Sequence, residues 1–467
     1  MTFGKREKIL LGVLAAVVVV TGLLETTRRS LRFDPGWENI DFTELEEVAL
    51  LQQFLQIDTS HETGSEMAGA RFLADILERE GIPYEIVDMG GGKANLIARL
   101  EGSTTETVVL HNHLDLDPIR SPESWRYPPF SGTIEAPWIY GRGAFDMKSV
   151  TIAQLLALVE LKRAGVHARR SVAFLATSSE EVDSEDGSLW LLRNRPEIFD
   201  DVWVLLTEGG VLEARGIRNI KYWGTEFQQK RYIRVLVCSP SRQRLLDLVS
   251  DIHRRGRPLD RLRVTPGVRT FLKSYGDTRD RRRYRELLSA PERLVENQRD
   301  FDELPSFLQG LFRDDIHPFE VVENPSGGGY QIRITLSLLE DSEVEEVIEH
   351  LLPSWMTAGL SMTVIVEPAA RGGSDPDHPF LALLAQVLEE RFGEVRSGPY
   401  FQGRSATDAR FFREAGVPSF GFTPFLALTT DTLAISGPNE GIALPAYIEG
   451  VDLYKDLLAR LALAPGE

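Results

Sequence analysis

The chain has 467 residues, which exceeds what one hydrophobic core usually serves, so we expect two domains. Its apolar fraction of 42% is ordinary for a globular protein, and its formal net charge of -18 argues against nucleic acid as a general partner. A single cysteine, Cys238, excludes an internal disulfide and any metal cluster built from several thiolates.

An uncharged apolar segment, ILLGVLAAVVVVTGLL (residues 9–24), lies near the N-terminus with charged residues on both sides. Its roughly 16 residues fall between the core of a signal peptide and a membrane span of about 20. Because no cleavage site of small residues follows, we expect residues 1–29 to be an uncleaved signal anchor, a transmembrane helix with its basic end in the cytoplasm. A cleaved signal peptide and a secreted protein are the alternative. Either prediction places the body of the protein outside the cytoplasm, in the periplasmic or extracellular space.

Residues 30–40 are expected to be a linker, and residues 41–219 then alternate between helical and strand patterns. Thr43 and Glu46 form a capping-box signal for the first helix. Helices are expected over residues 42–56, 68–81 and 149–164. Strands are expected over residues 95–100, 107–113, 171–177 and 202–206. This alternation predicts an α/β sheet with helices on both faces.

The pattern changes after about residue 220 and resumes after about residue 369. Between these points strands are expected over residues 232–237, 330–338 and 361–366, and helices over residues 244–255 and 342–352. The order suits a small α+β domain, residues 220–368, inserted into the larger one. Residues 369–467 then complete the α/β domain, with a helix over 380–393, a strand over 419–425 and a final helix from about Pro445.

The stretch HNHLDLDP follows an apolar run and alternates histidine with aspartate. In a strand, every second side chain points to the same face, so His111, His113, Asp115 and Asp117 are expected on one face. Strand ends are the usual place for sites in open α/β sheets. This strand is therefore the first candidate for a site.

Further acidic residues are expected where other strands end or where a helix begins. They are Asp146 in GRGAFDMK, Glu180 and Glu181 in TSSEEVDSEDG, and Glu208 in LLTEGG. Singly, each acid is more often a helix cap or part of a solvated loop. Together with imidazole, in a chain that lacks other thiols, they form a ligand set that zinc accepts. A spare glutamate beside a ligand glutamate also provides the base that metal-assisted hydrolysis needs.

These motifs carry a family resemblance. The run HLDLDPIRSPESWRYPPFSGTIEAPWIYGRGAFDMKSV resembles the signature of the di-zinc metallopeptidases that include aminoacylase, carboxypeptidase S and succinyl-diaminopimelate desuccinylase, the M20-type peptidases. TSSEEVDSEDG, LLTEGG and SATDARFFREAGVPSFGFTPF resemble the later motifs in the same order. The resemblance covers about residues 45–463. It implies a mixed-sheet catalytic domain, an inserted ferredoxin-like lid domain, and the family's habit of forming a homodimer through that lid.

The resemblance also implies roles for the acidic residues and His113. His113 is expected to bind one zinc ion, Asp146 to bridge both ions, and Glu208 to complete the first set. Glu181 is expected to bind the second zinc ion. Glu180 is expected to be the general base that activates the attacking water.

Three other residues follow from the same comparison of motifs. Asp115 is expected to hold the His113 imidazole in orientation. Arg410, in TDARFF, resembles a residue that meets the free carboxylate of a substrate. His111 matches no ligand and receives no role.

The chain departs from the family pattern in two places. Ser436, in ISGPNEGI, stands where the family has the histidine that closes the second zinc site, and the last histidine of the chain is His378. The strand RVLVCSPSRQR also lacks the lid histidine that steadies an oxyanion in the family, and His253 lies too far along the chain to replace it. One zinc site is therefore expected to be nearly complete, and the second is in doubt.

The function implied is hydrolysis of amide bonds next to a free carboxylate, in small peptides or N-acyl amino acids, with one or two zinc ions. The alternative is a catalytically impaired or non-catalytic relative, because both histidines are absent. A different hydrolytic reaction on the same scaffold is the third hypothesis.

Overall fold

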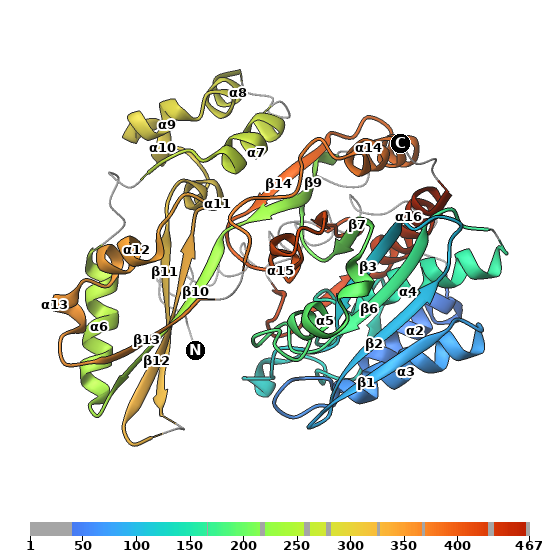
Figure 1. Cartoon of the computed structure of the whole chain (residues 1–467), viewed down its shortest axis with the longest axis horizontal. Coiled ribbons are helices and arrows are strands. Elements are labelled where there is room, and N and C mark those ends of the chain that lie inside the picture. The colour runs from blue at the N-terminus through green and yellow to red at the C-terminus, as the bar shows by residue number, and fades with distance from the viewer. Residues whose placement is uncertain are drawn as a thin grey trace, which may run out of the picture.

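The computed structural model describes residues 40–165, 167–214, 220–255, 262–276, 282–324, 327–366, 369–427 and 434–463. Two main sheets lie side by side, and the larger one forms the right half of the molecule in Figure 1. Among these residues, no helix has the length and apolar character that crossing a bilayer requires, and the expected anchor lies outside them.

The larger sheet is mixed, with the strand order β1-β2-β6-β3-β7-β15-β9-β14 and with β8 paired to β9. Its strands are β1 (Tyr84–Gly90), β2 (Lys93–Leu100), β3 (Thr107–His113), β6 (Ser171–Thr177), β7 (Val202–Thr207), β8 (Val211–Ala214), β9 (Ile220–Gln229), β14 (Ser397–Gln402) and β15 (Ser419–Gly421). The central strand β3 is parallel to both β6 and β7. Their carboxyl ends therefore meet at one edge of the sheet.

Helices cover both faces of this sheet, as the alternating pattern predicted (Figure 1). One layer contains α2 (Glu46–Leu55), α3 (Glu66–Arg79), α4 (Lys148–Arg163), α14 (Pro379–Phe392) and α16 (Leu444–Leu463). The opposite layer contains α5 (Ser188–Asn194) and α15 (Ala409–Glu414). Every residue of β3 is buried; Val108 and Leu110 pack into the first core and Val109 into the second. Because successive side chains of a strand point to opposite faces, β3 contributes apolar side chains to both cores.

The smaller sheet is antiparallel, in the order β11-β12-β10-β13. Its strands are β10 (Arg231–Ser239), β11 (Asp315–Glu323), β12 (Tyr330–Leu338) and β13 (Ser361–Val366), and its helices are α6 (Arg242–Arg255), α12 (Val344–Leu351) and α13 (Ser354–Thr357). This unit has its own apolar core, built from strand residues such as Val235 and Ile334 and helix residues such as Leu245. The chain passes from the larger sheet to the smaller one after Gln229, where β9 ends. The domain boundaries drawn from the sequence stay a prediction.

A group of short helices between β10 and β11 belongs to the core of the larger sheet. It comprises α7 (Pro266–Gly276), α8 (Arg282–Ser289), α9 (Glu292–Glu296), α10 (Gln298–Asp302) and α11 (Ser306–Gln309). Phe271 packs edge-on against Tyr400 of β14, with ring centroids 5.1 Å apart. The sequence patterns did not predict this packing.

A three-stranded sheet connects two segments that are distant in sequence. It consists of β4 (Thr133–Glu135), β5 (Trp138–Tyr140) and β16 (Gly441–Ala443), in the order β16-β5-β4. β16 pairs antiparallel with β5, and just beyond this pairing Gly141 N donates to Glu440 O at 3.0 Å. The ISGPNEGI segment is thereby fixed beside the turn that carries Asp146.

Candidate metal centre

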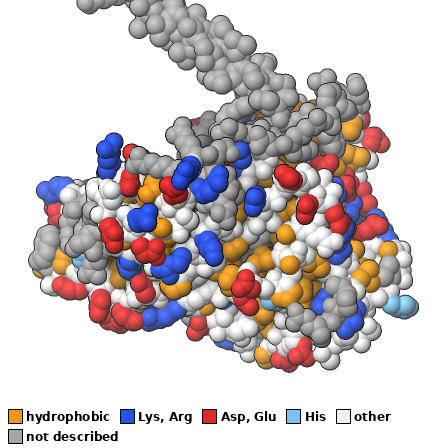
Figure 2. Space-filling view, turned by 90° about the horizontal axis from the view of Figure 1, so that it is seen from above, with side chains coloured by type: hydrophobic (Ala, Val, Ile, Leu, Met, Phe, Trp, Pro, Cys, Tyr) orange, Lys and Arg blue, Asp and Glu red, His pale blue; other side chains and the backbone are white. Residues whose placement is uncertain are grey.

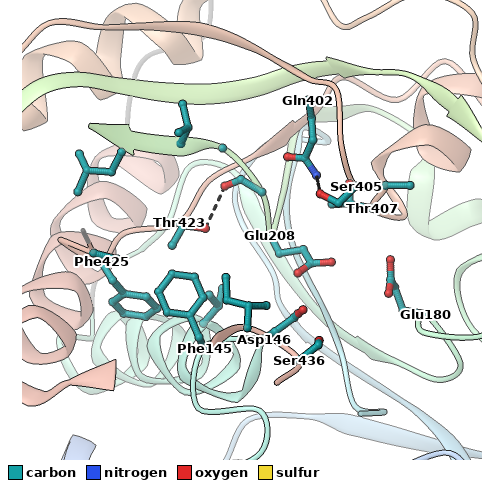
Figure 3. A pocket seen from close by; sticks show the side chains of 18 of the residues that line it. Phe145, Asp146, Glu180, Glu208, Gln402, Ser405, Thr407, Thr423, Phe425 and Ser436 are labelled. Atoms are coloured by element: carbon teal, nitrogen blue, oxygen red, sulfur yellow. Dashed lines mark hydrogen bonds between the residues drawn. The ribbon is translucent and has the colours of Figure 1, made fainter. Parts of the chain in front are cut away.

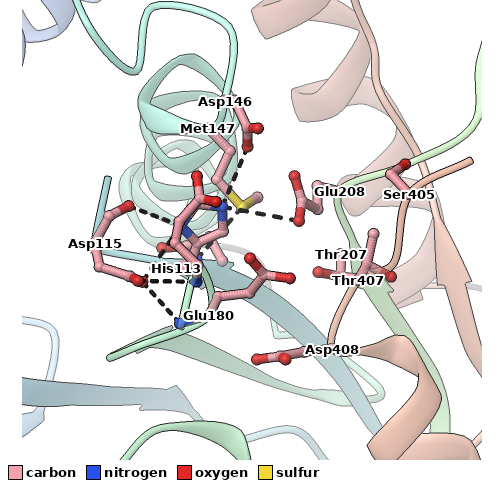
Figure 4. A network of polar contacts seen from close by, with 12 residues as sticks. His113, Asp115, Asp146, Met147, Glu180, Thr207, Glu208, Ser405, Thr407 and Asp408 are labelled. Atoms are coloured by element: carbon pink, nitrogen blue, oxygen red, sulfur yellow. Dashed lines mark hydrogen bonds and ion pairs between the residues drawn. The ribbon is translucent and has the colours of Figure 1, made fainter. Parts of the chain in front are cut away.

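Three of the predicted site residues follow the ends of neighbouring parallel strands. His113 is the last residue of β3, Glu180 comes three residues after the end of β6, and Glu208 directly follows β7. Because these strands run parallel, their ends deliver the three side chains to one place (Figure 4).

Asp146 reaches the same place from the turn before α4. Its carboxylate oxygen Oδ1 lies 3.3 Å from His113 Nε2, and Glu208 Oε1 lies 3.8 Å from the same nitrogen. The turn is held from outside the motif. Glu440 accepts the backbone N–H groups of Phe145 and Asp146 at 3.0 and 3.1 Å, and Arg142 donates to its second oxygen at 2.9 Å.

Asp115 contacts both halves of the predicted site. Its backbone carbonyl accepts a bond from His113 Nδ1 at 2.9 Å, which leaves Nε2 of that ring directed at the carboxylates. Its carboxylate accepts the backbone N–H groups of Glu180 and Glu181, each at 2.9 Å. Asp115 thus fixes the ring and the two glutamates relative to one another, as the dashed lines in Figure 4 show.

Two groups of side chains could hold a metal ion, and both include His113. One contains His113, Glu180 and Glu208, and the other contains His113, Asp146 and Glu181, with the ligand atoms of each group within 4.8 Å of one another. All five predicted residues are therefore brought together. The first group differs from the predicted set because Glu180, the expected base, stands where Asp146 was expected, so the assignment of individual roles stays a prediction.

The pKa shifts of these groups are those of a site that favours a positive charge. Burial raises the pKa of Glu208 to about 7, and the negative charge of Asp146 adds to the shift. Burial, followed by the charge of Glu208, raises the pKa of Glu180 well above its usual value. Burial opposes protonation of His113, but hydrogen bonds to Asp115, Asp146 and Glu208 outweigh it and raise the pKa of the ring.

The close packing of carboxyl groups around His113 shows whether a metal ion would fit this site. Four buried or half-buried carboxyl groups around one imidazole repel one another, and the protons that they hold reduce this repulsion, as do the nearby His113 and Arg410. A divalent cation with oxygen and nitrogen ligands would replace those protons. The donor set therefore fits a metal such as zinc.

Ser436 lies at the same cavity, which has a volume of about 470 Å³ and is also lined by Asp146, Glu180, Glu181 and Glu208. Figure 3 shows its side chain next to Asp146. The segment that the motif comparison singled out thus reaches this cavity. Among the described residues, His113 is the sole imidazole in either group of possible metal ligands.

The other histidines occupy different places. His378 caps α14 and packs against the ring of Trp203, with centroids 5.1 Å apart. His253 is exposed on α6, which packs against the core side of the smaller sheet. Neither can replace the two family histidines, as expected.

His111, which received no role from sequence, is part of a buried hydroxyl network. Its Nε2 lies 2.9 Å from Ser188 Oγ, whose proton goes to Asp408 at 2.6 Å, and its Nδ1 lies 2.9 Å from Thr207 Oγ1. Burial lowers the pKa of His111 to about 4, so the ring is neutral at pH 7. Thr207, which directly precedes Glu208, is thereby a hydrogen-bond partner of His111.

Arg410 lies beside a second cavity. It is in α15, is mostly buried, stacks on Phe411 at 4.1 Å and donates to the Thr407 carbonyl at 2.8 Å. The metal cavity is lined by Thr407 but not by Arg410. Its expected contact with a substrate carboxylate stays a prediction.

Sequence reasoning missed Glu440 and Asp408. Glu440 lies in the ISGPNEGI segment that was compared with the family, two residues after a proline. Its place in that motif was the available signal, and its burial is known only from the structure. Asp408 accepts from Ser184 and Ser188, each at 2.6 Å. Nothing in its local sequence indicated these distant partners.

Comparisons with known proteins identify the family of the chain. A family model described as peptidase family M20/M25/M40 matches residues 109–460. A probable succinyl-diaminopimelate desuccinylase of Staphylococcus aureus (strain Mu50) is 31% identical over 148 residues, which are 32% of this chain and 36% of that protein. The alignment thus spans about a third of that relative's length. Aminoacylase-1 of Sus scrofa is 25% identical over 429 residues, 90% of this chain and 96% of that one.

The fold also matches solved structures. The M20 family metallo-carboxypeptidase Sso-CP2 from Sulfolobus solfataricus superposes with a TM-score of 0.66 at 18% identity, over 89% of this chain and 98% of that one. At this identity the match concerns the fold alone. It covers the mixed α/β architecture that carries the strand-end carboxylates.

Proposed function

Because the chain belongs to peptidase family M20/M25/M40, we propose that it is a metal-dependent hydrolase of amide bonds in small peptides or N-acyl amino acids. The family predicted from the motifs is thereby confirmed. The observation that carries the proposed activity is the convergence of His113 with Asp146, Glu180, Glu181 and Glu208 in one cavity.

Zinc is the metal that this donor set suits best. His113, with Asp146 and Glu208 at 3.3 and 3.8 Å from its Nε2, would hold one ion, and Glu181 with Asp146 would offer ligands to a second. When bound, the metal would polarise the scissile carbonyl and acidify the attacking water. The remaining chemistry falls to residues of the chain.

Glu180 is the general base in this proposal. Its carboxylate faces Glu208 in Figure 4, and its backbone N–H is held by Asp115 at 2.9 Å. Burial raises its pKa, which favours proton uptake from water and later donation to the leaving amine. Arg410 would meet the free carboxylate of the substrate, beyond the Thr407 side of the metal cavity.

A second function is favoured by a specific observation: Ser436 lines the cavity where the family has a histidine. Neutral serine is a poor zinc ligand. β10 also carries no imidazole, and losing an oxyanion donor typically lowers a rate by about 10²–10³. A catalytically impaired relative that keeps one metal for binding is the alternative.

One experiment separates the two functions. The purified full chain is assayed for zinc per chain and for hydrolysis of a panel of dipeptides and N-acyl amino acids. Glu180→Gln should retain zinc and lose at least about 10²-fold in kcat, the usual contribution of a general base. Glu185→Gln, an exposed glutamate paired with Arg193, is the control. A wild type without metal, or activity indifferent to Glu180→Gln, contradicts the proposed hydrolase.

We also propose that residues 1–29 anchor the chain to a membrane with its body outside the cytoplasm, and that two chains associate through the smaller domain. The uncharged run over residues 9–24 supports the anchor, and secretion after cleavage is the alternative. Protease accessibility in intact cells tests the location. Sedimentation of the detergent-solubilised chain tests the dimer.

A further inference from the structure

A second cavity adjoins the metal cavity. It has a volume of about 280 Å³, and its lining residues are Tyr232, Arg234, His317, Phe319, Arg333, Thr335, Arg404, Ala406 and Arg410. Ala406 lines both cavities, while its neighbours Ser405 and Thr407 line the metal cavity. The segment 404–410 is therefore a wall that the two cavities share.

The smaller sheet supplies the opposite wall. Arg234 of β10 pairs with Thr335 of β12, which pairs with His317 of β11, so the three residues form one row across the sheet. Their neighbours in sequence, such as Val235 and Ile334, point into the apolar core on the other face. Because side chains alternate between the two faces of a strand, the polar row of Arg234, Thr335 and His317 faces the cavity.

This row lies close to the metal centre as well. Arg234 Nη1 donates to the carbonyl of Val182 at 3.2 Å, and Val182 follows Glu181 directly in the chain. A substrate held at the metal centre would therefore be able to extend towards the second cavity.

The charges of this second cavity stand out in a chain of net charge -18. Four arginines line it (Arg234, Arg333, Arg404 and Arg410), and none of its described lining residues is acidic. On the face shown in Figure 2, by contrast, acidic and basic side chains are intermixed. A cavity lined by cations without acids is a site of positive potential.

Two of these arginines lack an acidic partner among the described residues. Arg333 lies over the ring of Phe319 at 4.2 Å, and Arg404 donates to Ser306 Oγ at 3.1 Å; neither forms an ion pair with a described carboxylate. Burial, and then the positive charges of Arg234 and Arg120, lower the pKa of Arg333, and the negative charge of Asp117 offsets only part of this shift. The guanidinium groups therefore repel one another until an anion lies between them.

We propose that this cavity binds a substrate end with at least two negative charges, as on an acidic amino acid at the carboxyl side of the scissile amide. One carboxylate occupies the fork of one arginine, so a single free carboxylate at Arg410 leaves Arg333 and Arg404 without an anion. A second carboxylate uses them. The inference rests on the proposed hydrolase and names its substrate class.

The first test compares matched substrates on the zinc-loaded full chain. Ala-Glu and N-acetyl-glutamate should be hydrolysed with kcat/KM at least tenfold above Ala-Gln and N-acetyl-glutamine. Arg333→Gln and Arg404→Gln should reduce this ratio by at least threefold, mainly through KM. Both side chains are exposed, so these variants are expected to fold. Arg299→Gln, which removes an exposed arginine on α10, should leave the ratio unchanged.

The second test needs no turnover. Calorimetric titration should give a dissociation constant for glutarate at least tenfold below that for pentanoate, a monoanion with as many carbons. Arg333→Gln should weaken glutarate binding at least tenfold, and Arg299→Gln should not. This result without hydrolysis would support the anion cavity and count against the hydrolase. Hydrolysis without preference for the acidic substrates, or glutarate binding indifferent to Arg333→Gln, would overturn the anion cavity and leave the hydrolase standing.

Discussion

The carboxylate of Glu440 accepts the backbone N–H of Asp146 at 3.1 Å, although the two residues lie 294 positions apart. The same carboxylate accepts hydrogen bonds from Phe145 N and from Arg142. Its hydrogen bonds to the described residues therefore all go to the segment that presents Asp146. Glu440 is thus a positioning residue for the predicted bridging ligand, held in place by the β16–β5 pairing.

Glu440→Gln is expected to weaken zinc binding by about 10–100-fold, the usual effect of removing a partner that orients a ligand. Glutamine offers one acceptor oxygen where the carboxylate uses two, and it leaves the buried charge of Arg142 without its counter-ion. Competition with a chromogenic chelator measures the affinity, and thermal melting reports the accompanying loss of stability. Glu390→Gln, which breaks a surface pair with Arg460, should change neither. Wild-type zinc affinity in Glu440→Gln would show that the turn holds Asp146 unaided.

Asp115→Asn tests the link between His113 and the two glutamates. Asparagine accepts only one of the two N–H groups, and its own NH₂ group then faces the other. We expect kcat and zinc affinity to fall together, each by roughly 10–100-fold. Asp183→Asn is the matched control, because Asp183 accepts an exposed N–H in the same loop. Unchanged kcat with Asp115→Asn would mean that the loop orders itself without this carboxylate.

The strand-end part of the site followed from sequence because two local rules combine there. Apolar runs marked β3, β6 and β7 and placed acidic residues near their ends, and the motif resemblance assigned His113, Glu180 and Glu208 to one site. The α/β class with helices on both faces followed from the alternation of helices and strands, whereas the mixed sheet was implied by the resemblance. The strand order and the parallel pairing that bring these strand ends together are seen only in the structure.

Other features depend on contacts between distant segments and could not be predicted from the local sequence. The capping box predicted at Thr43 was wrong: Asp41 accepts Thr43 N at 3.1 Å and caps a 3₁₀ turn, and α2 begins later at Glu46. Two cap patterns overlap in those few residues, and packing decides between them. The partnership of Glu440 with Asp146 similarly arises from strand pairing across most of the chain.

Ser436→His is expected to raise bound zinc towards about two ions per chain, because it restores an imidazole beside Asp146. Ser436 has φ +52°, and histidine is among the residues that tolerate this left-handed region. Metal analysis after dialysis measures the change. Ser289→His, which adds a histidine on the exposed side of α8, controls for adventitious binding. Equal zinc in the two variants would place Ser436 outside the second set of ligands.

Glu66, the first residue of α3, links stability to pH. Both of its carboxyl oxygens are buried, and neither has a hydrogen-bond partner among the described residues. Burial, and then the charge of Asp115, raise its pKa to about 7 from 4.5. Between these two values the folded state holds a proton that the unfolded state has lost. The stability contributed by the neutral acid is thus complete below about pH 4.5 and is lost as the pH rises towards 7.

Glu66→Gln removes this titration, so its unfolding free energy should exceed that of the wild type by roughly 2–3 kcal/mol at pH 8 and match it near pH 5. Urea midpoints measured from pH 5 to pH 8 on both proteins give the difference directly, since the titrations of the metal centre are common to both. Glu62→Gln, an exposed change just before α3, should show no trend with pH. A difference that is constant across this range, or that shrinks as the pH rises, would mean that Glu66 is ionised in the folded protein.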